Sequence, residues 1–149
     1  MNVKRWLLAS LGVYVAHQVL NAIIHGVILM GKYEATASVW RHDTDDKMYI
    51  MHVTGAILSL LFVYIFTKGY EGRGILEGAR YGLWMGLLIT IPGAYGSYAV
   101  LDIPYCLAFS WWTLGTVQLI ICGIVAALLY KPAAAAAEPA PAEAPPSPE

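Results

Sequence analysis

The feature that most constrains this chain is a set of four apolar segments, each about as long as a membrane-spanning helix. The segments cover residues 6–30, 48–67, 79–100 and 105–130. A helix rises about 1.5 Å per residue, so roughly 20 apolar residues cross the hydrocarbon core of a bilayer. Hydrophobic residues make up 58% of the chain and charged residues only 13%, which is too apolar for a soluble domain of 149 residues. The sequence therefore predicts an all-α fold, a four-transmembrane-helix bundle.

The first segment has two basic residues before it, as a signal peptide does. It is longer than the apolar core of a signal peptide, it contains His17, Asn21 and His25, and no small-residue cleavage site follows it. We therefore expect it to be retained as the first helix of the membrane domain.

Basic residues predict the orientation of the chain in the membrane. With four spans, the two termini and the middle loop share one side. That side has Lys4, Arg5, Lys68, Arg73, Arg80 and Lys131, whereas the other has Lys32, Arg41 and Lys47. Because cytoplasmic loops carry the excess of Lys and Arg, both termini are expected in the cytoplasm (N-in/C-in).

The last part of the chain differs sharply from the rest in composition. Residues 132–149 are Ala, Pro and Glu with one Ser, and they hold six of the eight prolines. Such a segment has no apolar surface to bury, so a disordered cytoplasmic tail is expected there. The membrane domain is then residues 1–131, with no separate soluble domain.

One face of the first segment is polar. Ser10, Tyr14, His17, Asn21 and His25 fall within an arc of roughly 80° on a helix that turns about 100° per residue. Such groups inside a membrane must face protein, water or a ligand. A sixth polar residue lies near the middle of the last segment: Gln118, which we expect to find its partner on this face.

Histidines on two segments raise the possibility of a cofactor. His25 and His52 each lie about five residues from the predicted outer end of their segment, so an antiparallel hairpin would place them at similar depth, with His17 deeper. Facing imidazoles inside a helical bundle can ligate a b-type haem or a transition metal. No family-specific metal motif accompanies them.

Three interpretations of the polar face stay open at this stage. The side chains could hydrogen-bond between helices and nothing more. They could form a haem, metal or quinone site, or they could line a proton or small-solute path formed by Tyr14, His17, Asn21, His25 and Gln118. A divalent-cation site at His42, Asp43, Asp45 and Asp46 is a further hypothesis, although these residues lack EF-hand spacing.

The third segment has a stripe of small residues. Gly78, Gly82 and Gly86 are spaced by four, so they lie on one helix face. Small residues on one face allow close approach of another helix within a membrane. The pattern predicts a helix-packing face without indicating whether the partner helix belongs to the same chain or to another copy.

Motifs typical of soluble enzymes and nucleic-acid-binding proteins are missing from the sequence. It has no phosphate-binding loop, nucleophile elbow or dinucleotide fingerprint, and it has no basic run that would bind nucleic acid. The glycines of residues 69–74 predict a tight cytoplasmic turn, near which Glu71, Arg73, Glu77 and Arg80 could pair.

Residues 64–82 read Tyr-Ile-Phe-Thr-Lys-Gly-Tyr-Glu-Gly-Arg-Gly-Ile-Leu-Glu-Gly-Ala-Arg-Tyr-Gly. This stretch resembles a signature of small bacterial four-helix integral membrane proteins, and the resemblance extends over most of residues 1–131 without the tail. It implies a bacterial inner-membrane location and a shared cytoplasmic hairpin. It implies no activity and assigns no functional residue.

Together these patterns predict a small, non-enzymatic inner-membrane protein that acts as a homo-oligomer or as an accessory subunit beside other membrane subunits. A redox protein that binds haem or metal through His25 and His52 is the second hypothesis. A small transporter or proton path along the polar face is the third.

Overall fold

The computed structural model describes residues 2–41, 43 and 45–130, and within these ranges the chain is helical with no strand. Four helical segments are long and apolar enough to cross a membrane. They are α1 (Val3–Ile23), which is continued by the π-helix η1 (Ile24–Ile28), α3 (Met48–Lys68), α4 (Ile75–Val100) and α5 (Tyr105–Leu129). A long apolar helix is thus present at each of the four predicted positions, with shifts of a few residues at the ends. The predicted tail, residues 132–149, lies outside the described residues.

Local sequence signals explain where several helices begin and end. The side chain of Asn2 caps α1 by accepting a hydrogen bond from the Arg5 amide at 3.2 Å. Between α3 and α4, Gly72 and Gly74 adopt φ values of 78° and 71°, a region that residues with a side chain rarely occupy. Pro104 directly precedes α5, where a missing amide hydrogen leaves no helical bond unmade.

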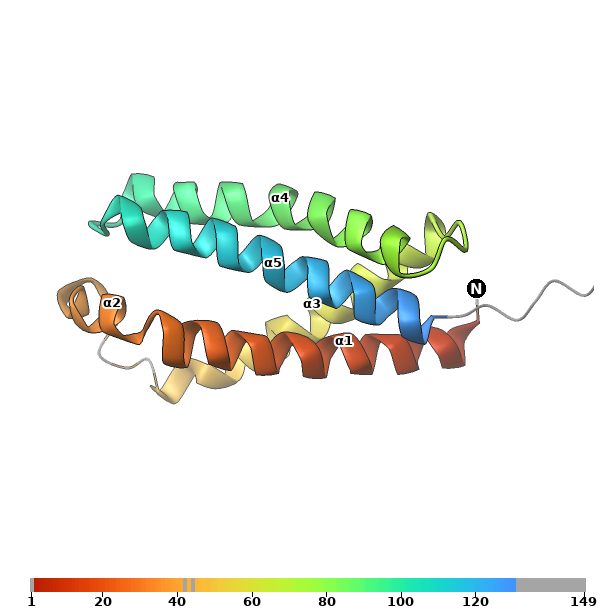
Figure 1. The fold of residues 1–149 in the computed structure, drawn as a ribbon. Helices are drawn as coiled ribbons and strands as arrows, with labels where there is room; N and C mark the ends of the chain where they lie inside the picture. The colour runs from red at the N-terminus through yellow and green to blue at the C-terminus, as the bar shows by residue number, and fades with distance from the viewer. Residues whose placement is uncertain (1, 42, 44, 131–149) are drawn as a thin grey trace, which may run out of the picture.

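The connection between α1 and α3 is long and partly helical. It contains α2 (Met30–Glu34) and the short 3₁₀ segments η2 (Ala37–Val39) and η3 (Asp45–Lys47). Figure 1 shows this connection at one end of the molecule, beside the turn from α4 to α5. We call this end the α2 end, and the opposite end, where residues 69–74 join α3 to α4, the hairpin end.

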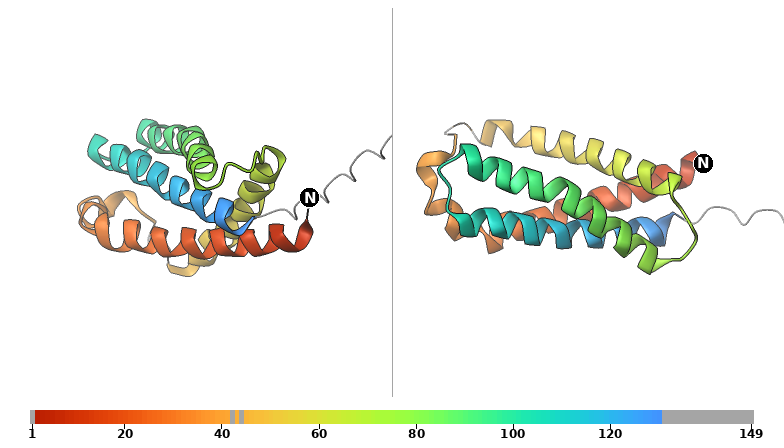
Figure 2. Two further views of the ribbon diagram at one scale, coloured as in Figure 1. Left: turned by 45° about the vertical axis from the view of Figure 1, so that its right-hand side comes forward. Right: turned by 90° about the horizontal axis from the view of Figure 1, so that it is seen from above.

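The long helices are arranged in the order α3, α1, α5, α4. Helix α4 follows α5 along its length, and α1 packs against both α5 and α3. Figures 1 and 2 show α3 and α4 close together at the hairpin end and diverging toward the α2 end. The start of α1 and the end of α5 both lie at the hairpin end.

Two groups of buried side chains hold this arrangement together. The larger lies toward the hairpin end, where Ala9 and Val13 of α1 meet Phe62 of α3 and Cys122 of α5. The smaller lies at the α2 end and contains Ile24, Leu29, Ile103 and Leu107. At the α2 end, the first two turns of α3 lie outside both groups, and every residue from Met48 to Thr54 is exposed.

Candidate functional site

The polar face of α1 divides into separate contacts along the helix. Ser10 is buried near the hairpin end, and its hydroxyl has no hydrogen-bond partner among the residues that the structure describes. Tyr14, His17 and Asn21 lie in the middle of the span, and His25 lies in the π-helix at the α2 end. The five residues therefore form no single site.

The middle contact is centred on Gln18, which the sequence did not single out. The Gln18 Nε2 atom lies 3.2 Å from the Tyr14 hydroxyl and 2.6 Å from Nδ1 of His52 on α3. An amide nitrogen only donates, so Nδ1 of His52 accepts and the neutral ring carries its proton on Nε2. This contact links α1 to α3 and leaves the His52 Nε2–H as a donor on the exposed side of α3.

Gln118 connects α5 to the same part of α1. It is only 6% exposed, and its Nε2 donates to the backbone carbonyl of His17 at 3.0 Å. The expectation that Gln118 faces the first helix is confirmed, although the acceptor is a backbone oxygen. The Nδ1 atom of the His17 ring is buried and has no hydrogen-bond partner within residues 2–41, 43 and 45–130.

A recess of about 200 Å³ lies between α1 and the first half of α3. His17, Gln18 and Asn21 form its α1 wall, whereas Met51 and Leu58 line the α3 side. Polar groups within a candidate membrane span thus line one side of this recess.

A second cluster lies at the α2 end around Tyr33. The Trp111 indole donates to the Tyr33 hydroxyl at 2.7 Å, and this hydroxyl lies 2.5 Å from Nδ1 of His25. Because the phenol oxygen accepts from Trp111, its own proton is available for His25. Trp40 completes the cluster with its ring centre 5.4 Å from that of Tyr33. Burial raises the pKa of Tyr33 above its ordinary value, and the bond from Trp111 partly opposes this shift.

The π-helix explains how His25 reaches this cluster. One extra residue in a helical turn changes the direction of the side chains, and such turns are common at functional positions. Lys32 fixes the following segment to α5, because its ammonium group donates to the Ser110 hydroxyl at 2.6 Å. The sequence pattern gave no sign of the π-helix or of the role of Tyr33.

The structure does not bring His25 and His52 to the same depth, so this expectation is wrong. His52 contacts Gln18, and His25 lies seven residues further along the helical chain, about 10 Å at 1.5 Å per residue. Since α1 and α3 run antiparallel, His25 lies level with residues that precede α3. Within residues 2–41, 43 and 45–130, no three His, Cys, Asp or Glu residues gather as a metal site.

The hypothetical cation site in the loop before α3 is only partly covered. His42 lies outside the described residues, as does the side chain of Asp45. Asp43 accepts hydrogen bonds from Arg41, at 2.8 Å, and from Lys47. These two cations, Arg41 foremost, hold the pKa of Asp43 below its usual range. The Asp43 carboxylate is therefore paired within its own loop.

The glycine stripe of α4 is used within the chain. A Cβ atom at Gly78 would overlap the carbonyl oxygen of Gly123, and one at Gly82 would overlap that of Leu119. At Gly86 a Cβ would lie 3.0 Å from the Cα of Thr116. The stripe thus lets the backbones of α4 and α5 touch, and it is not free to contact a second copy.

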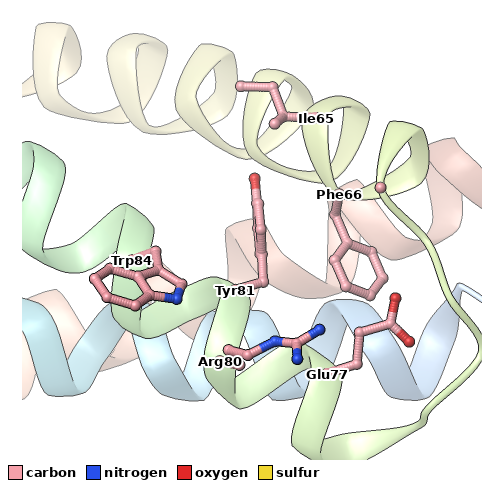
Figure 3. Close-up of a pocket in the computed structure, with 7 residues that line it drawn as sticks. Ile65, Phe66, Glu77, Arg80, Tyr81 and Trp84 are labelled. Atoms are coloured by element: carbon pink, nitrogen blue, oxygen red, sulfur yellow. The ribbon is translucent and has the colours of Figure 1, made fainter.

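The hairpin end has a recess of about 180 Å³ between α3 and α4 (Figure 3). The Tyr81 hydroxyl points to α3 and donates to the Phe62 carbonyl at 2.5 Å. Arg80 is paired with Glu71 at 2.9 Å. The cation at the edge of this recess is therefore already engaged in an ion pair.

Glu77 serves a different purpose from the one its sequence position suggested. It is 5% exposed, and its two carboxylate oxygens accept the backbone amides of Glu71 at 2.6 Å and Arg73 at 2.7 Å. The predicted pairing in this turn is confirmed for Arg73 and Arg80, which both bind Glu71. Glu77 instead closes the turn onto the first turn of α4.

Comparison of this chain with protein families, curated proteins and solved structures returns no match. The geometry described above is therefore the basis for the function proposed below.

Proposed function

We propose that this chain is a multi-pass protein of a bacterial inner membrane that acts without enzymatic activity, as an accessory subunit or as an oligomer. Its contact with other membrane subunits is made through the α1–α3 side. The observation that carries this proposal is the start of α3, where every residue from Met48 to Thr54 is exposed and one of them is His52.

The proposed orientation places the hairpin end in the cytoplasm. Lys4, Arg5, Lys68, Arg73 and Arg80 belong to this end, whereas Lys32, Arg41 and Lys47 belong to the α2 end. Positive charge concentrates on the cytoplasmic side of membrane proteins. Both termini are then cytoplasmic, and the Tyr33 cluster lies at the periplasmic surface.

Exposure of α3 supports a lateral partner. From Met48 to Thr54 the helix makes almost two turns with no face buried, and Tyr49 is 65% exposed. Apolar side chains there could contact lipid at no cost in free energy. The Nε2–H of His52 could not, because it would lie in hydrocarbon without a hydrogen-bond acceptor. A polar group in hydrocarbon needs protein, water or a ligand beside it.

The α4–α5 side gives no comparable reason for association. The glycines of α4 already contact α5. The exposed side chains of α4, including Trp84 and Leu88, are apolar and can contact lipid. A partner would therefore be recruited by the α1–α3 side of the molecule rather than by the small-residue stripe.

The native mass of the full chain tests this proposal. Extraction from native membranes in a mild detergent is expected to give a particle larger than the monomer, and His52→Leu is expected to reduce its mass. His25→Leu serves as the matched control, since His25 lies in the Tyr33 cluster. A wild-type protein that migrates as a monomer from native membranes would contradict the proposal.

A further inference from the structure

The recess between α1 and α3 has two unlike walls. On the α1 side, His17, Gln18 and Asn21 present polar groups. On the α3 side Met51 and Leu58 present apolar groups, and the Thr54 hydroxyl already donates to the Ile50 carbonyl of its own helix at 2.8 Å. These residues belong to the middle of α1 and the outer half of α3, and each lies within a candidate membrane span. A molecule that enters this recess would therefore come from the bilayer.

The polar wall has hydrogen-bonding capacity that the protein leaves unused. Both hydrogens of the Gln18 amide are engaged, one by Tyr14 and one by His52. The side chain of Asn21 makes no hydrogen bond with the part of the chain that the structure describes, and Nδ1 of His17 is buried without a partner. No bulk water reaches this depth of a bilayer, and a polar group without a hydrogen bond is unfavourable there. A bound molecule that supplies hydrogen-bonding groups would therefore be stabilised.

The size and the walls of the recess restrict that partner. A cavity of about 150 Å³ accepts a six-membered aromatic ring, so about 200 Å³ accommodates such a ring with substituents. The apolar α3 wall suits the face of a ring, and the amide hydrogens of Asn21 suit carbonyl oxygens at its edge. Neither wall carries a cation, so a lipid phosphate has no counter-ion there.

We propose that this recess binds the headgroup of a lipid-soluble quinone, with the ring between Asn21 and the α3 wall and the tail in the bilayer. Quinones combine a planar ring, carbonyl acceptors and solubility in hydrocarbon, which are the three properties that the recess selects. The proposal concerns binding alone and is independent of the accessory role proposed above.

Substitution of Gly55 provides a way to reduce the volume of the recess. It is buried on the α3 wall, and a Cβ placed there would lie 3.6 Å from the Gln18 amide, which is an ordinary contact. Gly55→Ala therefore adds a methyl group to the recess in ordinary contact with the Gln18 amide. Asn21→Leu removes the free amide while keeping a similar size.

Binding is measured with the full chain in phosphatidylcholine nanodiscs and a tritium-labelled ubiquinone analogue with a short tail. We expect saturable uptake above that of empty nanodiscs, about tenfold weaker affinity in Asn21→Leu, and a smaller loss of affinity in Gly55→Ala. His25→Phe lies outside the recess and should bind like the wild type. Thermal melting in the same nanodiscs shows that each variant is folded.

Two results would overturn the proposal. One is uptake by the wild type that rises linearly and equals that of empty nanodiscs, which would leave the recess to water or to a neighbouring subunit. The other is equal affinity of the wild type and both folded recess variants, which would place the quinone elsewhere on the protein.

Discussion

The backbone of Gly78 lies so close to that of Gly123 that neither residue has room for a Cβ atom. This contact holds α4 against α5. The small-residue stripe of α4 therefore packs within a single chain. Small residues replace the hydrophobic effect as a source of helix association in membranes, because close backbone approach increases van der Waals contact. The α4–α5 pair is thus a rigid unit, and the α1–α3 side is left for other interactions.

Substitution in the stripe should separate α4 from α5. Gly82→Ala places a Cβ against the Leu119 carbonyl, so we expect a loss of about 1–3 kcal/mol in the free energy of unfolding. Gly96→Ala on the same helix meets no atom within 4 Å and should be neutral or slightly stabilising. Thermal unfolding in detergent compares the two, and equal losses would contradict the assignment of the stripe to α5.

Glu77 should matter more than its charged neighbours. Glu77→Ala leaves the amides of Glu71 and Arg73 without their acceptor, and we expect a loss of about 1.5–3 kcal/mol. Glu71→Ala removes only exposed ion pairs and should change stability by less than about 1 kcal/mol. Thermal unfolding and limited proteolysis at residues 69–74 measure both effects. If Glu71→Ala proves the more harmful, the exposed ion pairs close the turn instead.

Tyr33 should make the stability of the α2 end depend on pH in the alkaline range. Its pKa is raised in the folded protein, so its contribution to stability is complete below the ordinary value, near 10, and is lost as pH rises through the folded value. Tyr33→Phe should flatten the dependence above about pH 10. It should also speed hydrogen exchange at the Trp111 indole, which NMR detects. Tyr49→Phe, at an exposed position, is the control, and an unchanged Trp111 signal in Tyr33→Phe would argue against the cluster.

Some features of this chain can be predicted from its sequence, and others depend on which residues lie beside each other in the fold. Span positions follow from composition, which needs no knowledge of neighbours, and α3 begins at Met48 as expected. The role of Gln18 in joining α1 to α3 cannot be predicted from the sequence, because it depends on the position of His52 on another helix. The depth of His25 was misjudged because the π-helix and the long connection to α3 leave no periodic pattern in the sequence. Glu77 was grouped with its charged neighbours, although its partners are backbone amides, which are the same in any sequence.

Topology can be tested by labelling single cysteines with a membrane-impermeant maleimide. In a Cys106→Ser, Cys122→Ala background, a cysteine at Asp46 should react in intact cells. A cysteine at Glu71 should react only after the inner membrane is permeabilised, because the basic residues place the hairpin end in the cytoplasm. The reverse pattern would invert the orientation, and with it the proposed periplasmic position of the Tyr33 cluster.

The central claim is that the exposed outer half of α3 contacts another membrane subunit. The most direct measurement introduces a photo-crosslinking residue at Val53 of α3 and, as a control, at Leu88 of α4, which are 54% and 67% exposed. After illumination of native cells, we predict discrete crosslinked products from position 53 and only lipid adducts from position 88. Products that are absent at position 53, or that are equal at both positions, would contradict the claim.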